Sequence, residues 1–188
     1  SLDLQAMIAF HKEKKGLGVL HLIRVEDPSA FGCVVNDEQK RISAFVEKPP
    51  KGTEPTNEIN AGTYLLEREV LDMIPAGRNV SIERETFPEI LAGGDALYAY
   101  TTDDYWIDLG RPEHYLAAHR DALAGRLPFD LDTDPAGWPD GSIIPPVHID
   151  RSARISPSAR VGPNAVLGKD VVIGERAVVR NSVLWDGV

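Results

Sequence analysis

The chain of 188 residues is 43% apolar and 26% charged, which is typical of a folded globular protein and excludes a disordered or fibrous one. Its formal net charge of -9 argues against broad binding to nucleic acid or to an anionic membrane, because no basic patch in the sequence offsets the repulsion. The single cysteine, Cys33, cannot form an internal disulfide, which favours the cytoplasm, and no apolar run approaches the roughly 20 residues that span a bilayer.

The chain begins with a predicted amphipathic helix that Asp3 can cap. Its apolar face follows the i, i+3, i+4, i+7 spacing through Leu4, Met7, Ile8 and His11. A strand over 18–25 comes next. The apolar runs 32–36 and 41–48 then flank a polar turn at 37–40, which predicts a hairpin.

Further strands and helices alternate after this hairpin. The predicted strands are 61–66 and 96–102, and the predicted helices are 67–74, 81–94 with Ser81 as its cap, and 111–125. Such alternation favours an α/β domain whose sheet is largely parallel and covered on both faces, with the hairpin inserted. We therefore expect one α/β domain over residues 1–125.

Residues 126–146 contain five prolines and no periodicity, which predicts a linker. A six-residue repeat follows over 147–188. Every sixth residue is apolar, in the series Ile149, Ile155, Val161, Leu167, Ile173, Val179 and Trp185, and small residues follow four positions later, in the series Ala153, Ala159, Ala165, Val171, Ala177 and Val183. This period predicts a left-handed parallel β-helix with the apolar residue of each hexad pointing inward. About two coils are present without a cap, and the first predicted helix has no element before it, so we expect both ends of the chain to continue in a longer protein.

Three groups of residues could carry chemistry. Glu47 and Lys48 end an apolar run, Asn60 precedes the small residues Ala61 and Gly62, and Asp108 lies between a tryptophan and the last predicted helix. In a parallel sheet, ligands collect at the carboxyl ends of the strands, and we expect all three groups at such ends. Lysine suits a phosphate, glutamate and asparagine suit hydroxyls, and aspartate suits Mg²⁺, so together they favour a sugar phosphate as ligand.

The sequence also resembles the sugar-1-phosphate nucleotidylyltransferases. The resemblance rests on five motifs in order: "FGCV" (31–34), "FVEKP" (45–49), "NAGTYLL" (60–66), "SIERETFP" (81–88) and "YWIDLGRPEHY" (105–115). Followed by hexapeptide coils, this combination is most similar to the mannose-1-phosphate guanylyltransferases. It implies a partial Rossmann-like nucleotidylyltransferase domain and an in-line attack by the sugar 1-phosphate on a nucleoside triphosphate, with release of pyrophosphate.

The resemblance also implies residue roles. Glu47 would bind the sugar hydroxyls, Lys48 the sugar phosphate, Gly32 and Asn60 with Gly62 the sugar, and Asp108 the catalytic Mg²⁺. The glycine-rich nucleotide loop of the family does not occur in residues 1–188, so we expect this chain to carry the sugar-phosphate half of the site and to be inactive alone. The coil offers a flat stackable face, and we expect it to serve assembly into homo-oligomers or regulation.

Alternatives remain open at this point. The substrate could be glucose 1-phosphate with an adenylyl or thymidylyl donor, or the chain could belong to a non-catalytic regulatory subunit. A hexapeptide acyltransferase is disfavoured because only His148 stands near the coil as a base. Glu47 and Lys48 could be an exposed strand-end pair, Asp108 a helix cap, Asn60 a turn residue and Gly32 a hairpin glycine.

Overall fold

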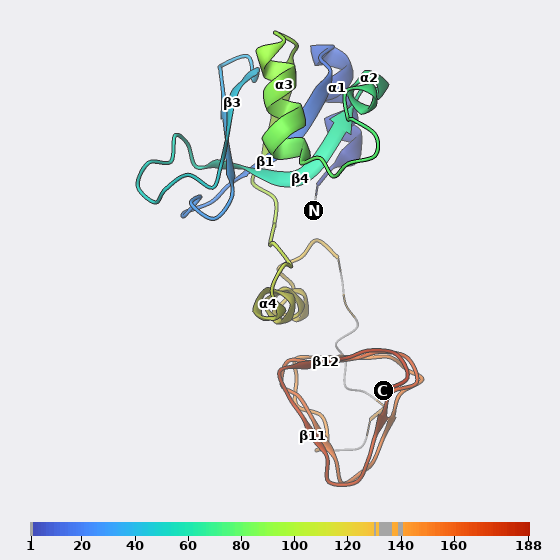
Figure 1. The fold of residues 1–188 in the computed structure, drawn as a ribbon. Coiled ribbons are helices and arrows are strands. Elements are labelled where there is room, and N and C mark those ends of the chain that lie inside the picture. Colours follow the sequence, from blue (N-terminus) through green and yellow to red (C-terminus); the bar gives the residue numbers. More distant parts are fainter. Residues whose placement is uncertain (1, 130, 132–136, 139–140) are drawn as a thin grey trace. The chain divides into compact units, whose positions relative to one another are not determined.

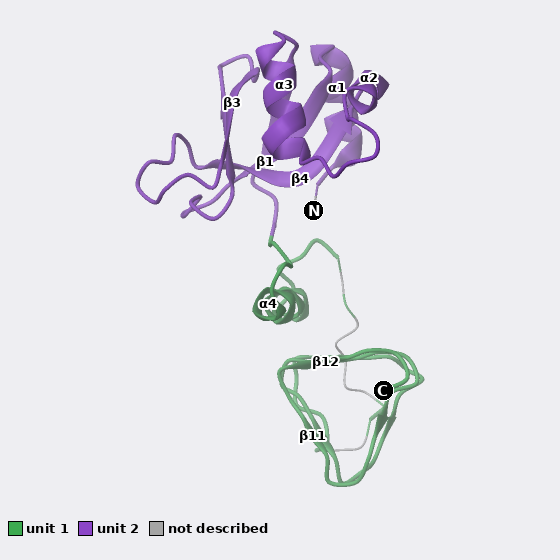
Figure 2. Ribbon diagram, in the orientation of Figure 1, with its two compact units in different colours: residues 1, 107–188 green, residues 2–106 purple. Residues whose placement is uncertain are grey.

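The computed structural model describes residues 2–129, 131, 137–138 and 141–188. They form two compact units, which Figure 2 distinguishes by colour: an amino-terminal unit, Leu2–Trp106, and a carboxy-terminal unit that begins at Ile107. The predicted linker 126–146 includes residues 130, 132–136 and 139–140, which lie outside the described residues. No helix in the described ranges is long and apolar enough to cross a membrane.

The amino-terminal unit is built on a five-stranded sheet of order β3-β2-β4-β1-β5. Its strands are β1 (Gly18–Arg24), β2 (Gly32–Asn36), β3 (Ile42–Glu47), β4 (Glu58–Leu66) and β5 (Leu97–Thr102). β2 and β3 form the predicted hairpin. The prediction of a largely parallel sheet was wrong: β1 is parallel to β5, whereas β1–β4, β2–β3 and β2–β4 are antiparallel.

The reason for this direction lies in the connections. Parallel neighbours need a crossover of a dozen or more residues, which is usually a helix, whereas antiparallel neighbours need only a turn or a loop. The helices of this unit lie before β1 and between β4 and β5, and none occurs between β1 and β4. The short turn between β2 and β3 therefore requires antiparallel pairing, and without a crossover helix the chain also returns through β4 antiparallel to β1 and β2.

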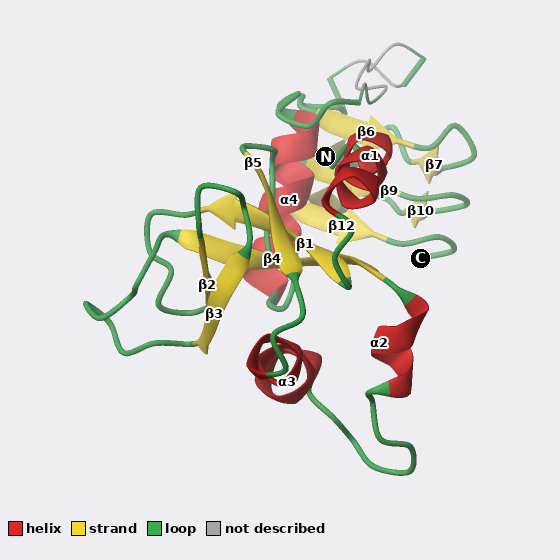
Figure 3. Ribbon diagram, turned by 90° about the horizontal axis from the view of Figure 1, so that it is seen from above, coloured by secondary structure: helices red, strands yellow, loops and turns green. Residues whose placement is uncertain are grey.

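Helices cover both faces of the sheet (Figures 1 and 3). They are α1 (Leu4–Lys14), α2 (Arg68–Asp72) and α3 (Phe87–Ala92). Asp3 caps α1 as predicted, since its carboxylate accepts hydrogen bonds from the N–H groups of Gln5 and Ala6. Phe10 of α1 packs on Tyr100 of β5. The core on the α3 face contains buried side chains of β1, β2, β3, α2, α3 and β5, namely Leu20, Leu22, Val34, Ile42, Val70, Phe87, Ile90, Leu97 and Ala99.

The predicted helix over 81–94 is divided in two. Ser81 caps it as expected, with its hydroxyl accepting from the N–H of Arg84, but the first turn, Ile82–Thr86, is a π-helix (η1) and only then does α3 begin. Pro88 is the second residue of α3 and has no N–H to donate to the preceding turn. Single π-helical turns frequently occur at functional sites.

The carboxy-terminal unit contains α4 (Pro112–Leu123) and three small parallel sheets of order β12-β9-β6, β10-β7 and β11-β8. The strands are β6 (Val147–Ile149), β7 (Arg154–Ile155), β8 (Arg160–Val161), β9 (Ala165–Leu167), β10 (Val172–Ile173), β11 (Val178–Val179) and β12 (Ser182–Leu184). Figure 1 shows these strands along the sides of a triangular winding of the chain.

Successive turns of this winding pair in parallel. Arg154 lies opposite Val172, Arg160 opposite Val178, and Val147 opposite Ala165. Most of the residues predicted to point inward form one cluster, with Ala153, Ala159, Val161, Ala165, Leu167, Val171 and Ile173 buried and Ile149, Ile155, Ala177 and Val179 partly buried against them. The prediction was wrong for Trp185, which is 68% exposed and stacks on Tyr115 of α4 instead.

Candidate functional site

A row of polar residues crosses three adjacent strands of the amino-terminal unit. Gly32 of β2 lies opposite Glu47 of β3, and the pairing of Cys33 with Ile59 sets Gly32 opposite Asn60 of β4 on its other side. Residues that face each other across antiparallel strands present their side chains on one face of the sheet. The sheet therefore holds the carboxylate of Glu47 and the amide of Asn60 on either side of a glycine. Asn60 lies near the start of β4, so its expected place at a carboxyl strand end was wrong.

Gly32 leaves the space that the Glu47 side chain occupies. A Cβ atom built on Gly32 would lie 2.9 Å from Oε2 of Glu47 and 2.8 Å from Cε1 of Phe45. The carboxylate therefore leans over the bare backbone of position 32, and its side chain is only 18% exposed. Any larger residue at position 32 would force this carboxylate or the Phe45 ring to move.

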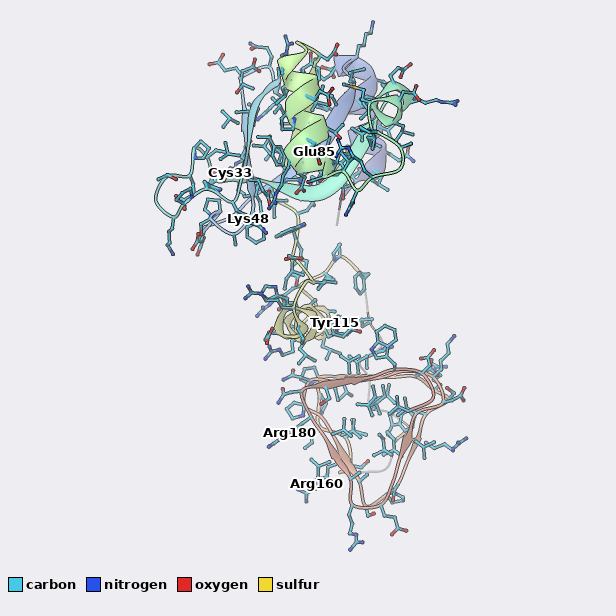
Figure 4. All side chains as sticks on the ribbon, viewed as in Figure 1. Cys33, Lys48, Glu85, Tyr115, Arg160 and Arg180 are labelled. Atoms are coloured by element: carbon cyan, nitrogen blue, oxygen red, sulfur yellow. The ribbon has the colours of Figure 1, made fainter. Side chains whose placement is uncertain are left out.

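Lys48 follows Glu47 in a conformation that side-chain-bearing residues rarely adopt. Its φ is 48°, and its N–H donates to the carbonyl of Phe31 at 3.1 Å. A residue in the left-handed region costs free energy, and such residues cluster at binding and active sites. The lysine side chain, labelled in Figure 4, is 60% exposed. Its Nζ lies 3.8 Å from Oε1 of Glu47.

The amide of Asn60 is fixed by a partly buried network of hydrogen bonds. Its Nδ2 donates to the hydroxyl of Tyr64 at 2.6 Å and to Oε1 of Glu83 at 2.5 Å, and its Oδ1 accepts from the N–H of Gly62 at 3.1 Å. The Tyr64 hydroxyl donates to the same Glu83 oxygen at 3.1 Å. Both amide hydrogens of Asn60 are thereby used, so Asn60 can offer a ligand only an acceptor lone pair on Oδ1.

Burial, supported by the negative charges of Glu83 and Glu47, raises the pKa of Tyr64 to about 12, although the hydrogen bond from Asn60 opposes this shift. The phenol therefore stays neutral at physiological pH and acts only as a hydrogen-bonding group.

A bulge in β4 brings these groups together. Leu20 of β1 pairs with Tyr64 and Leu22 pairs with Asn60, so four residues of β4 span the length of two in β1. Gly62 lies in the bulge at φ 81°, where a Cβ atom would meet no other atom within 4 Å. Glycine is needed there for its backbone conformation and not for space. The indole of Trp106 donates to the carbonyl of Ala61 at 3.0 Å, which ties the bulge to the end of the unit.

Arg84 brings a second cation to Glu47. Its Nη2 lies 3.8 Å from the same Oε1 that Lys48 approaches, and its side chain is 64% exposed. Glu83 and Arg84 are neighbours in the π-helical turn η1, and both reach the polar row. Sequence reasoning did not select Tyr64, Glu83 or Arg84. Tyr64 could have been found, because a residue four positions after Asn60 in a strand lies on the same face.

Asp108 belongs to the carboxy-terminal unit, so the unit that holds Lys48 does not contain it. Its Oδ1 accepts from the N–H of Gly110 at 3.1 Å, and its carbonyl oxygen is 2.8 Å from Nδ1 of His114. Asp108 is not the cap of α4: the cap position is Arg111, which has no side-chain capping bond. The residue is exposed. The sequence-based expectation that Asp108 and Lys48 share one pocket stays a prediction.

Comparisons with known proteins agree with the motifs. A family profile described as "Nucleotidyl transferase" matches residues 1–125, and one described as "GMPPB C-terminal domain" matches residues 143–188. The mannose-1-phosphate guanylyltransferase of Mycobacterium tuberculosis is 46% identical over 127 residues, which are 67% of this chain and 35% of that protein. Mannose-1-phosphate guanyltransferase of Eremothecium gossypii is 39% identical over 155 residues, which are 80% of this chain and 40% of that protein.

A third relative covers nearly the whole chain. The UTP–glucose-1-phosphate uridylyltransferase of Synechocystis is 30% identical over 200 residues, which are 98% of this chain and 52% of that protein. Among solved structures, HddC from Yersinia pseudotuberculosis is similar at 27% identity and a TM-score of 0.51, over 62% of this chain and 48% of that chain. A structure of the same protein complexed with GMP-PN gives a TM-score of 0.50. The chain thus spans between a third and about half of the length of these relatives.

Proposed function

Because the chain belongs to the nucleotidyl transferase family, we propose that it forms the sugar-phosphate half of an enzyme that transfers a guanylyl group from GTP to mannose 1-phosphate. The products are GDP-mannose and pyrophosphate. The single observation that carries the proposal is the polar row: a carboxylate and a fixed amide on either side of Gly32, with the cation of Lys48 next to them. Two relatives named for this activity support the choice of substrate.

Each residue of the row has one part in substrate binding. The carboxylate of Glu47 accepts hydrogen bonds from sugar hydroxyls, and Oδ1 of Asn60 offers one further acceptor. Gly32 and Gly62 let the sugar lie against bare backbone. The ammonium of Lys48 binds the phosphate and reduces the repulsion between the sugar phosphate and the triphosphate. The reaction needs no protein nucleophile, so positioning and charge neutralisation by these residues are the main contributions to catalysis.

Mg²⁺ is part of this proposal, with Asp108 as its protein ligand. The exposed carboxylate of Asp108 accepts a hydrogen bond through Oδ1 from Gly110, and no described residue donates a hydrogen bond to its Oδ2. Within the described residues no three or more His, Cys, Asp or Glu side chains gather to hold a metal. Mg²⁺ does not need such a group, because it is commonly held by one or two carboxylates and the substrate phosphates. When bound, the ion would neutralise charge on the triphosphate.

We further propose that the three parallel sheets are the faces of a left-handed parallel β-helix that serves assembly into homo-oligomers or regulation. Support comes from the hydrogen bonds between residues 18 apart, such as the N–H of Asp170 to Oγ of Ser152 and the N–H of Arg176 to Oγ of Ser158. In its described residues the stack presents no group of three or more His, Cys, Asp or Glu side chains that could hold a metal. A strictly monomeric full-length protein in sedimentation would contradict the assembly role. We place the enzyme in the cytoplasm.

A second candidate substrate is glucose 1-phosphate, and the uridylyltransferase of Synechocystis favours it because that similarity extends over both units. The two candidates are separated by turnover of a panel of sugar 1-phosphates and nucleoside triphosphates by the full-length enzyme, followed through pyrophosphate release. We expect the highest kcat/KM for mannose 1-phosphate with GTP. A strong preference for glucose 1-phosphate would contradict the mannose assignment.

A further inference from the structure

Two cations approach one carboxylate oxygen in the amino-terminal unit. Nζ of Lys48 and Nη2 of Arg84 each lie 3.8 Å from Oε1 of Glu47. Glu47 is mostly buried, with 18% of its side chain exposed, whereas both cations are more than half exposed. The carboxylate of Glu47 is therefore shared by two positive charges, while the other carboxylate of the polar row, Glu83, is hydrogen-bonded to Asn60 and Tyr64.

The hydrogen-bonding groups of both cations remain available. A separation of 3.8 Å is too long for a hydrogen bond, and among the described residues neither side chain contacts another acceptor at bonding distance. Three other cations of this unit have close partners: Arg78 lies 2.7 Å from Glu85, Arg24 lies 2.8 Å from Glu58, and Lys51 lies 3.0 Å from Asp27. The two cations beside Glu47 differ from these three ion pairs, because both share one carboxylate oxygen at a distance too long for a hydrogen bond.

The backbone at both cations departs from regular strand or α-helix geometry. Lys48 has a φ of 48°, which a side-chain-bearing residue adopts only at a cost. Arg84 lies in the π-helical turn η1. Its backbone N–H donates to the hydroxyl of Ser81 at 3.3 Å. Both unusual conformations aim cations at the same oxygen, and π-helical turns frequently mark functional sites.

We propose that Arg84 is a second phosphate-binding residue, which together with Lys48 holds the phosphate of the sugar 1-phosphate beside Glu47. This inference rests on the proposed function and adds a residue to its site. A phosphate dianion is negatively charged and has several acceptor oxygens. It can therefore accept the hydrogen bonds that the side chains of Lys48 and Arg84 do not donate within the described residues. The planar guanidinium presents two parallel N–H donors that match two phosphate oxygens, whereas the lysine ammonium lacks this fixed geometry.

The test measures the affinity of the 188-residue chain for mannose 1-phosphate, glucose 1-phosphate and phosphate-free mannose by NMR titration. The variants are Arg84→Gln, Arg84→Lys and Lys48→Gln. The matched controls are Arg68→Gln, which removes an exposed arginine of α2, and Lys51→Gln, which removes a lysine three residues after Lys48 that pairs with Asp27. Thermal unfolding of each variant checks its fold.

We expect Arg84→Gln to weaken binding of the sugar phosphate about tenfold and Arg84→Lys to weaken it less, with affinity for mannose and both controls unchanged. Equal affinity of Arg84→Gln and Arg68→Gln for the sugar phosphate would overturn the inference. If Lys48→Gln nevertheless weakens binding of the sugar phosphate, the proposed function still holds. If Arg84→Gln weakens mannose as much as mannose 1-phosphate, Arg84 acts through Glu47 and the inference is wrong. If the unmodified chain binds neither mannose 1-phosphate nor glucose 1-phosphate, both proposals are overturned.

Discussion

The role of Gly32 gives the sharpest prediction, through the substitution Gly32→Ala. The added Cβ would lie 2.9 Å from Oε2 of Glu47 and 2.8 Å from Cε1 of Phe45, so these atoms must retreat by about half an ångström to regain a normal separation. The Phe45 ring cannot retreat freely, because it packs against the core and lies 5.9 Å from the ring of Phe87. The Glu47 carboxylate is therefore the group that moves most.

Two losses follow from this displacement. Overpacking beside Phe45 should lower the free energy of unfolding by about 1–3 kcal/mol. Displacing Glu47 should remove one hydrogen bond to a charged group, worth about 1.5–3 kcal/mol, so affinity for mannose 1-phosphate should fall by about one to two orders of magnitude.

Urea unfolding and a binding titration measure the two effects. Gly93→Ala is the matched control in the same unit, since its nearest neighbour would lie at an ordinary 3.4 Å. If Gly32→Ala has the unfolding free energy and the affinity of this control, Gly32 does not make room for Glu47 and the reasoning is refuted.

Lys48→Ala should weaken binding of mannose 1-phosphate by one to two orders of magnitude, since a hydrogen bond to a charged group contributes about 1.5–3 kcal/mol; a titration showing less than a twofold change would remove Lys48 from the site. Tyr64→Phe should abolish the last phase of tyrosine ionisation in an absorbance titration, because the pKa of Tyr64 is raised by burial to about 12. The Tyr64 phenol ionises at lower pH in the unfolded state than in the folded state. The unfolding free energy of the unmodified protein should therefore fall as pH rises from about 10 to about 12, and that of Tyr64→Phe should fall less. An equal fall in both proteins would contradict the hydrogen-bond network of Asn60, Tyr64 and Glu83. In the coils, Gly162→Ala should destabilise the carboxy-terminal unit by several kcal/mol, because its Cβ would clash with the carbonyl of Ile144. The added Cβ of Gly174→Ala meets no atom within 4 Å, so this variant should change the unfolding midpoint little. Similar unfolding midpoints for the two variants would contradict the packing of the coils.

Local features of this fold were predictable from the sequence. The caps Asp3 and Ser81 depend on hydrogen bonds to N–H groups two or three residues away, so a short pattern is enough to identify them. The inward positions of the hexads, such as Val161 and Leu167, follow from a period that repeats along the chain. Trp185 departed from that period because it stacks on Tyr115, a residue far from it in sequence.

The arrangement of the candidate site could not be predicted in the same way. The sequence identified Glu47, Lys48 and Asn60 as polar residues at element ends, but the row that joins them depends on which strands pair and in which direction. Glu83 reaches Asn60 over a separation of 23 residues, and no period in the sequence links the two positions. In the sequence, Glu83 is an acidic residue in a first helical turn, where it is favourable for electrostatic reasons alone.

The most direct test of the account is a crystal structure of the protein soaked with mannose 1-phosphate and Mg²⁺. We predict the phosphate within hydrogen-bonding distance of Nζ of Lys48, a sugar hydroxyl on the carboxylate of Glu47, and Asp108 as a ligand of the ion. A sugar phosphate bound elsewhere, with Lys48 and Asp108 in separate cavities, would contradict it.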